Sequence, residues 1–453
     1  NIIIGCICFA GVLFFGITLM EVNPDFVALA AIVLIVFFGI RDKRFLLAGW
    51  FLVSPYFSPF GVEGMANIAS NFSHNIIVPI ISIIILSLSF AKQKRIAFGK
   101  EELLLLCFVG YAFLSSFFAT KGRYDDLRMI YLIYLIPFFL YLVVKNIRID
   151  TKLFQMFAYV SIFHIVAVSM MCAYETVTGE VLYHSQLDWN DVGSGHRFGG
   201  PFGSPIILGL FVPTVFFYIY LACKFELIPR YVMWVSAVLA TVLILATFTR
   251  SVWLGAFVAF IYVMYKTGRE GKTQLLRLAM FAAAAVLIVG VITIVSPAVQ
   301  QRLTGEENAN FRVVMAEASL NMIKDKPLVG WGAGTFDDNS DRYLFDALGV
   351  YIVKDTSHVT LLTILAELGM LGGLLFLLFI YFNLSHKGVK MSDLPPDDQL
   401  IVALNIGGVL IFAINGFLID MRFYSVAYSW FFINMGFIYS MYRDHAQQNI
   451  AIT

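Results

Sequence analysis

Long apolar runs separated by short polar breaks extend along almost the whole chain. A run of about 20 apolar residues has the length of an α-helix that crosses the hydrocarbon core of a bilayer. The pattern predicts about 14 such helices, or 12 to 13 if the short run at 45–56 and the interrupted tract around residue 250 do not count separately. The expected helices cover residues 2–19, 26–40, 45–56, 76–90, 103–119, 129–144, 153–172, 206–223, 232–248, 252–265, 278–295, 359–382, 400–419 and 427–441.

The composition agrees with this pattern. Of 453 residues, 60% are hydrophobic and only 13% are charged, whereas soluble domains carry about a quarter charged residues. The short alternating segments of a transmembrane barrel are absent from the sequence. We therefore expect an all-α polytopic membrane protein whose single integral membrane domain spans residues 1–453 and contacts membrane lipids. The formal net charge of +1 gives no support for a nucleic-acid partner.

The basic residues indicate an orientation. Most of the 31 lysine and arginine residues lie in alternate loops, and such loops face the cytoplasm. With an even number of helices, both ends of the chain are expected to be cytoplasmic. Two longer loops, at 173–204 and 296–358, then face the extracytoplasmic side. Both carry charged residues that could take part in chemistry.

The larger loop contains a helical pattern of its own. Apolar residues recur there at helical spacing, namely Phe311, Val314, Met315, Ala318 and Met322. This spacing predicts an amphipathic helix lying on the bundle or at the lipid interface. Proline and glycines at 327–334 are expected to end it. The acidic run at 337–341 is interpreted as a solvated turn, because it lacks the glycine and the final glutamate of a calcium-binding loop.

Two arginines are candidates for binding an anion. Arg250 interrupts an apolar tract, where a guanidinium either extends to the interface or faces a polar cavity. Arg197 precedes Gly199, Gly200 and Gly203, which allow a ligand to approach the backbone closely, just before an expected helix start. The alternatives are an interfacial arginine that ends a helix and a solvated loop arginine.

His358 is a candidate general base. It lies one residue before a long apolar helix, where an imidazole can accept a proton near neutral pH. The alternative is that residues 356–358 only cap the helix. Glu367 lies about 13 Å deeper along that helix, too far to contact His358, and could orient polar partners within the bundle. Arg312, on the amphipathic helix, could instead belong to a solvated face.

Other catalytic signatures are absent from the sequence. There is no phosphate-binding GxxxxGK[ST] loop, no HExxH pair, no GxSxG elbow and no acidic pair suited to Mg²⁺ on the outer face. No CxxC or Cys/His spacing suggests zinc. We therefore expect no metal, no cofactor and no ATP-driven step.

Four strings of the sequence together resemble the O-antigen ligase family of bacterial inner-membrane proteins, which includes lipopolysaccharide O-antigen ligases and Wzy-type polysaccharide polymerases. The first is RFGGPFGSP, which begins at Arg197, and the second is TRS around Arg250. The third is Arg312 followed by DKPLVGWG at 325–332. The fourth is His358 followed by GMLG at 369–372, with Glu367 two residues before its first glycine.

The resemblance implies a metal-independent, inverting glycosyl transfer at the periplasmic face of the inner membrane. The donor would be a glycan on undecaprenyl diphosphate and the acceptor a sugar hydroxyl. Arg197 and Arg250 would hold the diphosphate, His358 would be the general base, and Arg312 would position the loop or add to the anion site.

The sequence leaves three functions open. A ligase, with lipid A–core as the acceptor, is expected first, and a polymerase that elongates a lipid-linked repeat is second. A lipid-linked oligosaccharide flippase is the third, although it predicts an internal symmetry and midplane charges that the sequence lacks.

Overall fold

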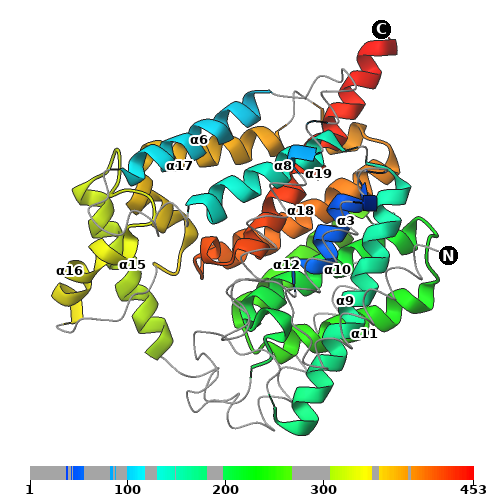
Figure 1. Cartoon of the computed structure of the whole chain (residues 1–453), viewed down its shortest axis with the longest axis horizontal. Coiled ribbons are helices and arrows are strands. Elements are labelled where there is room, and N and C mark those ends of the chain that lie inside the picture. Colours follow the sequence, from blue (N-terminus) through cyan, green and yellow to red (C-terminus); the bar gives the residue numbers. More distant parts are fainter. Residues whose placement is uncertain are drawn as a thin grey trace. The chain divides into compact units, whose positions relative to one another are not determined.

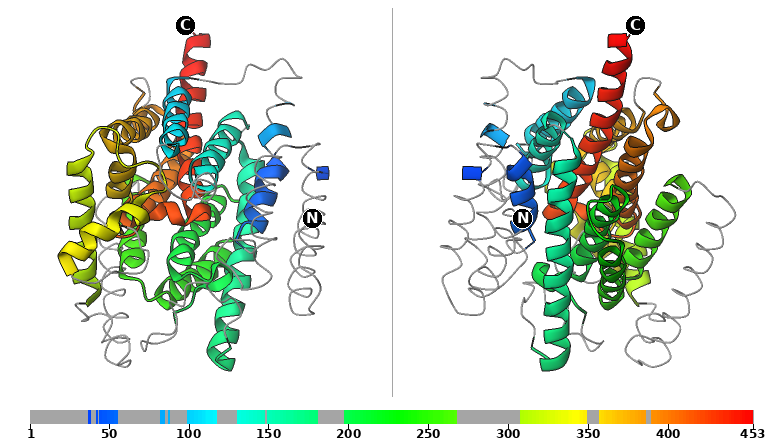
Figure 2. Two further views of the ribbon diagram at one scale, coloured as in Figure 1. Left: turned by 60° about the vertical axis from the view of Figure 1, so that its left-hand side comes forward. Right: turned by 90° about the vertical axis from the view of Figure 1, so that its right-hand side faces the viewer.

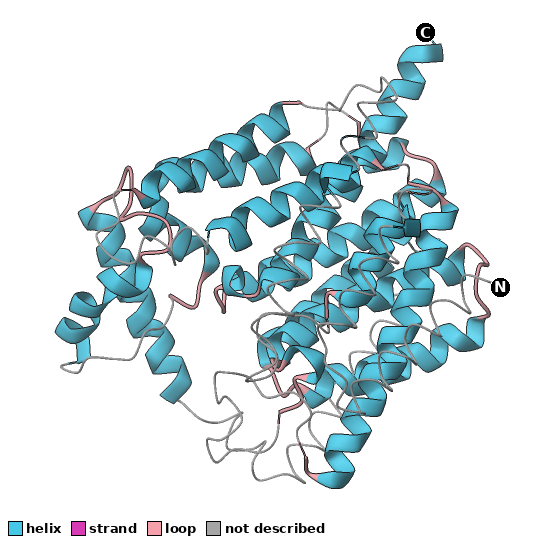
Figure 3. Cartoon of the chain, in the orientation of Figure 1, coloured by secondary structure: helices cyan, strands magenta, loops and turns pink. Residues whose placement is uncertain are grey.

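The computed structural model describes residues 37–38, 42, 44–55, 82–84, 87, 99–117, 130–147, 149–180, 197–267, 307–348, 357–385 and 389–452. Within these ranges every regular element is a helix (Figures 1 and 3), which confirms the all-α prediction. The contacts divide the chain into two compact units. One comprises Asn1–Ile96 with Val143–Ala256, and the other comprises Ala97–Leu142 with Phe257–Thr453.

The first unit is built around three long helices. α9, α10 and α11 pack against one another, and α3 packs on α9. The described elements of this unit are α3 (Arg44–Val53), α9 (Thr151–Thr178), the 3-10 turn η3 (Gly200–Phe202), α10 (Pro205–Lys224), α11 (Arg230–Ala246) and the start of α12 (Arg250–Thr267).

Local sequence signals set the ends of α9. The Asp150 side chain accepts a hydrogen bond from the Leu153 amide at 3.1 Å and so caps the N-terminus. Gly179, in the left-handed conformation with φ 74°, ends the helix. Inside, the buried ring of His164 lies 3.0 Å from the carbonyl oxygen of Phe51 on α3, so the imidazole joins these two helices.

The second unit contains the long polar loop and the C-terminal helices. α17 packs against α6, α15 and α19, while α18 packs against α19 (Figure 2). Its described elements are α6 (Lys100–Ser116), the π-helical turn η2 (Tyr131–Leu135), α8 (Ile136–Asn146), α15 (Glu307–Asp325), α16 (Phe336–Leu348), α17 (Thr360–Leu384), η4 (Met391–Asp393), α18 (Pro396–Gly416), η5 (Met421–Phe423) and α19 (Ser425–Ile452).

Several described helices have the character of membrane spans. Among the described residues, four helices are long and apolar enough to cross a bilayer: α9, α10, α17 and α18. Ten of the expected helices fall on described helices. The other four, at 2–19, 26–40, 76–90 and 278–295, lie wholly or mostly outside the described residues. The apolar helices fit a multi-pass membrane protein, and the count of about 14 stays a prediction.

The amphipathic helix expected in the long loop is α15. It ends at Asp325, two residues before Pro327, as the proline and glycine signals predict. Its residues Met315, Ala318 and Met322 are buried in a cluster with Phe336 and Leu344 of α16 and Ala366 of α17. This face is therefore covered by protein.

The interpretation of residues 337–341 as a solvated turn was wrong, because they form the first turns of α16. Asp337 and Asp338 lie in its first turn, where carboxylates interact favourably with the helix dipole. The burial of Phe336 and Leu344 then holds the helix against α15.

α17 is interrupted at Gly369, whose backbone (φ 63°, ψ −170°) is not helical. The loop after α15 pairs with the backbone on both sides of this break. The Trp331 and Gly332 amides donate to the carbonyls of Ala366 and Glu367 at 3.0 and 2.8 Å. Two further bonds run in the other direction, from Met370 to Pro327 at 2.8 Å and from Leu371 to Leu328 at 3.2 Å. The loop thus satisfies polar groups that the break leaves without helical partners.

Candidate active site

Arg197 joins its own loop to the segment that carries Arg250. Its Nε donates to the Thr247 carbonyl at 3.2 Å, and its Nη2 donates to the Thr249 hydroxyl at 2.5 Å. The next residue, Phe198, donates its amide to the Ala246 carbonyl at 3.1 Å. Arg250 follows Thr249 directly and is exposed at the first position of α12. Two arginine-bearing segments about fifty residues apart are therefore neighbours within the first unit.

The turn after Arg197 requires its glycines. Gly200 and Gly203 have left-handed backbones, with φ 56° and 59°. A Cβ at Gly199 would lie 2.7 Å from the backbone of Gly203 and Ser204. This tight turn leads directly into α10, so the start of a helix follows closely behind Arg197. The free amides at a helix start favour anions.

The connection between α11 and α12 is short and is held by hydrogen bonds. α11 ends at Ala246, and Phe248 adopts a left-handed backbone with φ 45°. The indole of Trp253 donates to the Ile244 carbonyl at 2.8 Å, which ties the first turn of α12 to the last turn of α11. The break around residue 250 is therefore real, and Arg250 begins a helix rather than ending one.

His358 directly precedes α17 and is partly exposed. Its backbone is left-handed (φ 57°), a conformation that is uncommon for residues other than glycine. The Ser357 hydroxyl beside it contacts the Thr363 hydroxyl and accepts from the Val359 amide at 3.1 Å. The backbone that carries the imidazole is therefore defined by several local hydrogen bonds.

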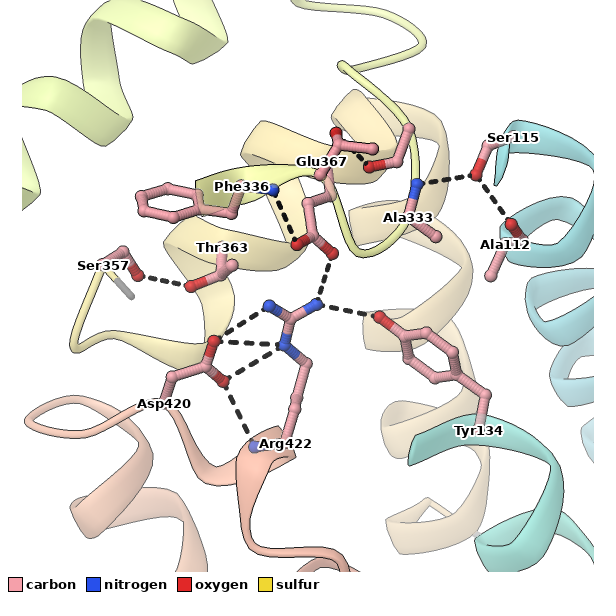
Figure 4. Close-up of polar contacts among 12 residues, drawn as sticks. Ala112, Ser115, Tyr134, Ala333, Phe336, Ser357, Thr363, Glu367, Asp420 and Arg422 are labelled. Carbon is pink, nitrogen blue, oxygen red and sulfur yellow. Dashed lines mark hydrogen bonds and ion pairs between the residues drawn. The ribbon is translucent and has the colours of Figure 1, made fainter. Parts of the chain in front are cut away.

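Glu367 belongs to a buried charged cluster that is centred on Arg422 (Figure 4). One carboxylate oxygen pairs with Arg422 Nη1 at 2.7 Å, and the other accepts from the Phe336 amide at 3.3 Å. The same Nη1 donates to the Tyr134 hydroxyl at 2.9 Å, and Nη2 pairs with Asp420 at 2.9 Å. The side chains of Glu367 and Arg422 are each only 2% exposed.

The charge state of this cluster follows from its geometry. Burial by itself lowers the pKa of the Arg422 guanidinium, but Asp420 and Glu367 beside it raise that pKa well above its ordinary value. Arg422 is therefore a permanent cation. Both carboxylates accept hydrogen bonds from N–H donors at each oxygen, as ionised carboxylates do.

The predicted site residues fall in both units. Arg197 and Arg250 belong to the first unit, and Arg312, His358 and Glu367 belong to the second. Arg312 is exposed on α15. Among the described residues, no group of three or more His, Cys, Asp or Glu side chains is arranged to hold a metal ion.

Sequence reasoning missed Arg422, Asp420 and Tyr134. A usable signal existed, because Glu367 is the one charged residue within the 25 residues of α17. A charge at that depth is expected to pair with another. The DMR tripeptide at 420–422, between two apolar runs, offers the opposite charge.

The apolar helices and the polar segments at their ends define a multi-pass membrane protein. Residues 235–377 match the family model Wzy_C, described as O-Antigen ligase, and this match supports an O-antigen ligase family assignment. It confirms the resemblance that the sequence strings indicated. The matched residues include Arg250, Arg312, His358 and Glu367, while Arg197 lies before them. No curated protein matches the chain.

Proposed function

We propose that this protein is a membrane glycosyltransferase that moves a glycan from undecaprenyl diphosphate to an acceptor hydroxyl at the periplasmic face of the bacterial inner membrane. The family match supports a function of the ligase or polymerase type. Ligation to lipid A–core is the specific activity that we propose. The observation that carries the proposal is the set of hydrogen bonds from Arg197 to Thr247 and Thr249, which brings two predicted anion-binding segments together.

Arg197 and Arg250 would bind the diphosphate of the donor. A guanidinium presents a planar set of N–H donors that matches phosphate oxygens, and it stays charged at every relevant pH. As the bond between the sugar carbon and the diphosphate oxygen breaks, that oxygen keeps the electron pair. Two nearby cations stabilise this negative charge, which is the role a metal ion has in other transferases.

His358 would accept the proton of the acceptor hydroxyl. Loss of this proton makes the oxygen a better nucleophile as it forms the new bond to the sugar carbon from the side opposite the leaving diphosphate. The sugar carbon is therefore inverted. A general base in this position typically contributes about 10²–10⁴-fold to the rate. Arg312, exposed on α15, would add to the anion site or position the loop. Glu367 would orient polar partners within the bundle.

The proposal is tested by transfer in vitro. The donor would be the lipid-linked glycan extracted from a host strain that lacks this protein, and the acceptor would be lipopolysaccharide core from the same strain. We expect Arg197→Ala, Arg250→Ala and His358→Ala each to lower kcat/KM at least about 100-fold, and EDTA to have no effect.

Matched substitutions control for loss of charge or of an imidazole elsewhere. Arg230→Ala, at the exposed start of α11, and His445→Ala, in α19, should retain full activity. Full activity in one of the three site variants would remove that residue from the site. Product that grows on the lipid carrier instead of on core would identify a polymerase, and lipid movement without any product would identify a flippase.

A further inference from the structure

We propose that Arg422 is a positioning residue for His358, acting through Glu367, Asp420 and Thr360. This inference rests on the proposed role of His358 as the general base. Arg422 has no contact with substrate in this proposal. Its role is to hold the first two turns of α17, and therefore the backbone of His358, in one place.

The Arg422 guanidinium bonds to three side chains. Its Nη1 bonds Glu367 and the Tyr134 hydroxyl, while Nε and Nη2 bond the Asp420 carboxylate. These bonds join α17, η2 and the segment before η5 (Figure 4). A planar guanidinium fixes the directions of its partners as well as their distances.

Stability alone explains such a cluster poorly. Removing three charges from water carries a desolvation penalty that their attraction repays only with very good geometry. Apolar side chains of similar volume often stabilise a protein equally well or better. A directed arrangement of three chain segments is what the charged cluster provides and an apolar cluster would not.

The hydroxyl of Thr360 connects the segment around Arg422 to the start of α17. The Thr360 hydroxyl accepts from the Met421 amide at 2.9 Å and donates to the Ile419 carbonyl at 3.2 Å. Thr360 is the first residue of α17 and lies two residues after His358. Residues 419–422 therefore hold α17 at two points, Thr360 and Glu367, which are seven residues or about 10 Å apart along the helix.

The position of His358 follows from that of α17, because His358 lies two residues before the first residue of the helix. Two attachment points prevent both sliding and rotation of the first turns of α17. Because His358 has a left-handed backbone, the direction of its imidazole depends on neighbours that hold this uncommon conformation. Thr360 on one side and the Ser357 bonds on the other provide that support.

The test uses the purified full-length protein and the in vitro transfer assay described above, with the extracted lipid-linked glycan as the probe. Thr360→Val keeps the shape of the side chain but removes both hydrogen bonds, whereas Thr360→Ser keeps the hydroxyl. We expect Thr360→Val and Arg422→Lys to lower kcat about 10- to 100-fold, because a displacement of about 1 Å has effects of this size. The KM for the donor should stay unchanged, and Thr360→Ser should restore most of kcat.

Two comparisons separate positioning from loss of stability. Tyr141→Phe removes a buried hydrogen bond to Asn383 on the same helix, far from His358, and should keep wild-type kcat. In a His358→Ala background, Thr360→Val should cause no further loss, because its effect passes through the missing imidazole. Thermal unfolding in detergent shows whether the Arg422→Lys variant is folded. If it is not, the kcat of Thr360→Val is the measurement that tests the positioning role.

The outcomes are distinguishable. If His358→Ala loses activity but Thr360→Val retains wild-type kcat, the positioning role is wrong and the proposed function stands. An equal loss from Thr360→Val with and without His358 also contradicts the positioning role. Full activity of His358→Ala would overturn the assignment of the base, and this inference with it.

Discussion

Gly330 and Gly369 approach each other so closely that neither position has space for a side chain. A Cβ on Gly330 would lie 2.3 Å from the Glu367 carbonyl oxygen, and a Cβ on Gly369 would lie 2.3 Å from that of Leu328. Both backbones are left-handed, with φ 70° and 63°. The two strings at 325–332 and 369–372, which are far apart in the sequence, therefore form one paired structure at the break in α17.

The first prediction concerns these glycines. Gly330→Ala and Gly369→Ala should each destabilise the protein by more than the roughly 1–3 kcal/mol of an unfavourable φ, because backbone atoms on the other segment would have to move. We expect a large fall in Tm measured by thermal unfolding in detergent.

Two other glycines serve as controls. Gly179 also has a left-handed backbone, but a Cβ there would meet nothing within 4 Å, so Gly179→Ala reports the cost of φ alone. Gly110 lies within helix α6, and a Cβ there would also meet nothing within 4 Å. Gly110→Ala should therefore stabilise the protein by up to about 1 kcal/mol. If Gly330→Ala were no worse than Gly179→Ala, the close approach would not constrain the loop.

The sequence predicted those parts of the fold that depend on local patterns. Apolar runs gave helices such as α10 and α17 to within a few residues, and the spacing of Met315, Ala318 and Met322 gave α15 with its buried face. Such periodicity reflects which face of a helix is covered, and it is visible in a short window.

Features that depend on contacts between distant segments were not visible. Arg422 and Glu367 are 55 residues apart, and although the single charge within α17 predicts a charged partner, the sequence does not identify the residue that supplies it. The loop after α15 pairs with α17 only because the helix is broken at Gly369, and the apolar sequence of α17 does not predict this break. At 337–341 the local acidic character suggested a turn, but the tertiary contacts of Phe336 and Leu344 favoured a helix.

A second prediction concerns the position of Arg197. Thr249→Val should raise the KM for the lipid-linked donor several-fold, because it removes the hydroxyl that accepts from the guanidinium. Thr249→Ser should behave as the wild type. The measurement is the donor dependence of transfer in vitro, with the acceptor saturating. An unchanged KM in Thr249→Val would show that the hydrogen bond to Thr249 does not position Arg197 for binding of the donor.

A third prediction concerns the attachment of α15 to α16 and α17. Met322 is fully buried in their shared cluster, so Met322→Ala should cost about 2–5 kcal/mol of stability through lost contacts and a cavity. Leu320→Ala, on the same helix but with 48% of the side chain exposed, should cost much less. Thermal unfolding compares the two variants. Equal losses would indicate that the cluster does not hold α15.

The last prediction concerns pH and the ion pairs of Asp42, which lies just before α3 and pairs with Arg44 of α3 and Lys152 of α9. The hydrogen bond from Arg44 is the largest of the influences that hold the pKa of Asp42 well below its usual range, and Lys152 adds to it at 2.8 Å. A carboxyl whose pKa is lower in the folded state stabilises the fold above its unfolded pKa of about 4 and loses this contribution as the pH falls further.

Asp42→Asn should therefore lower stability by about 1 kcal/mol at pH 7 and progressively less in more acidic solution. In an Arg44→Met background the same substitution should have little further effect, because the main partner is gone. Thermal unfolding between pH 3 and pH 7 tests both expectations, and a difference between wild type and Asp42→Asn that stays constant over that range would contradict the assigned ion pair.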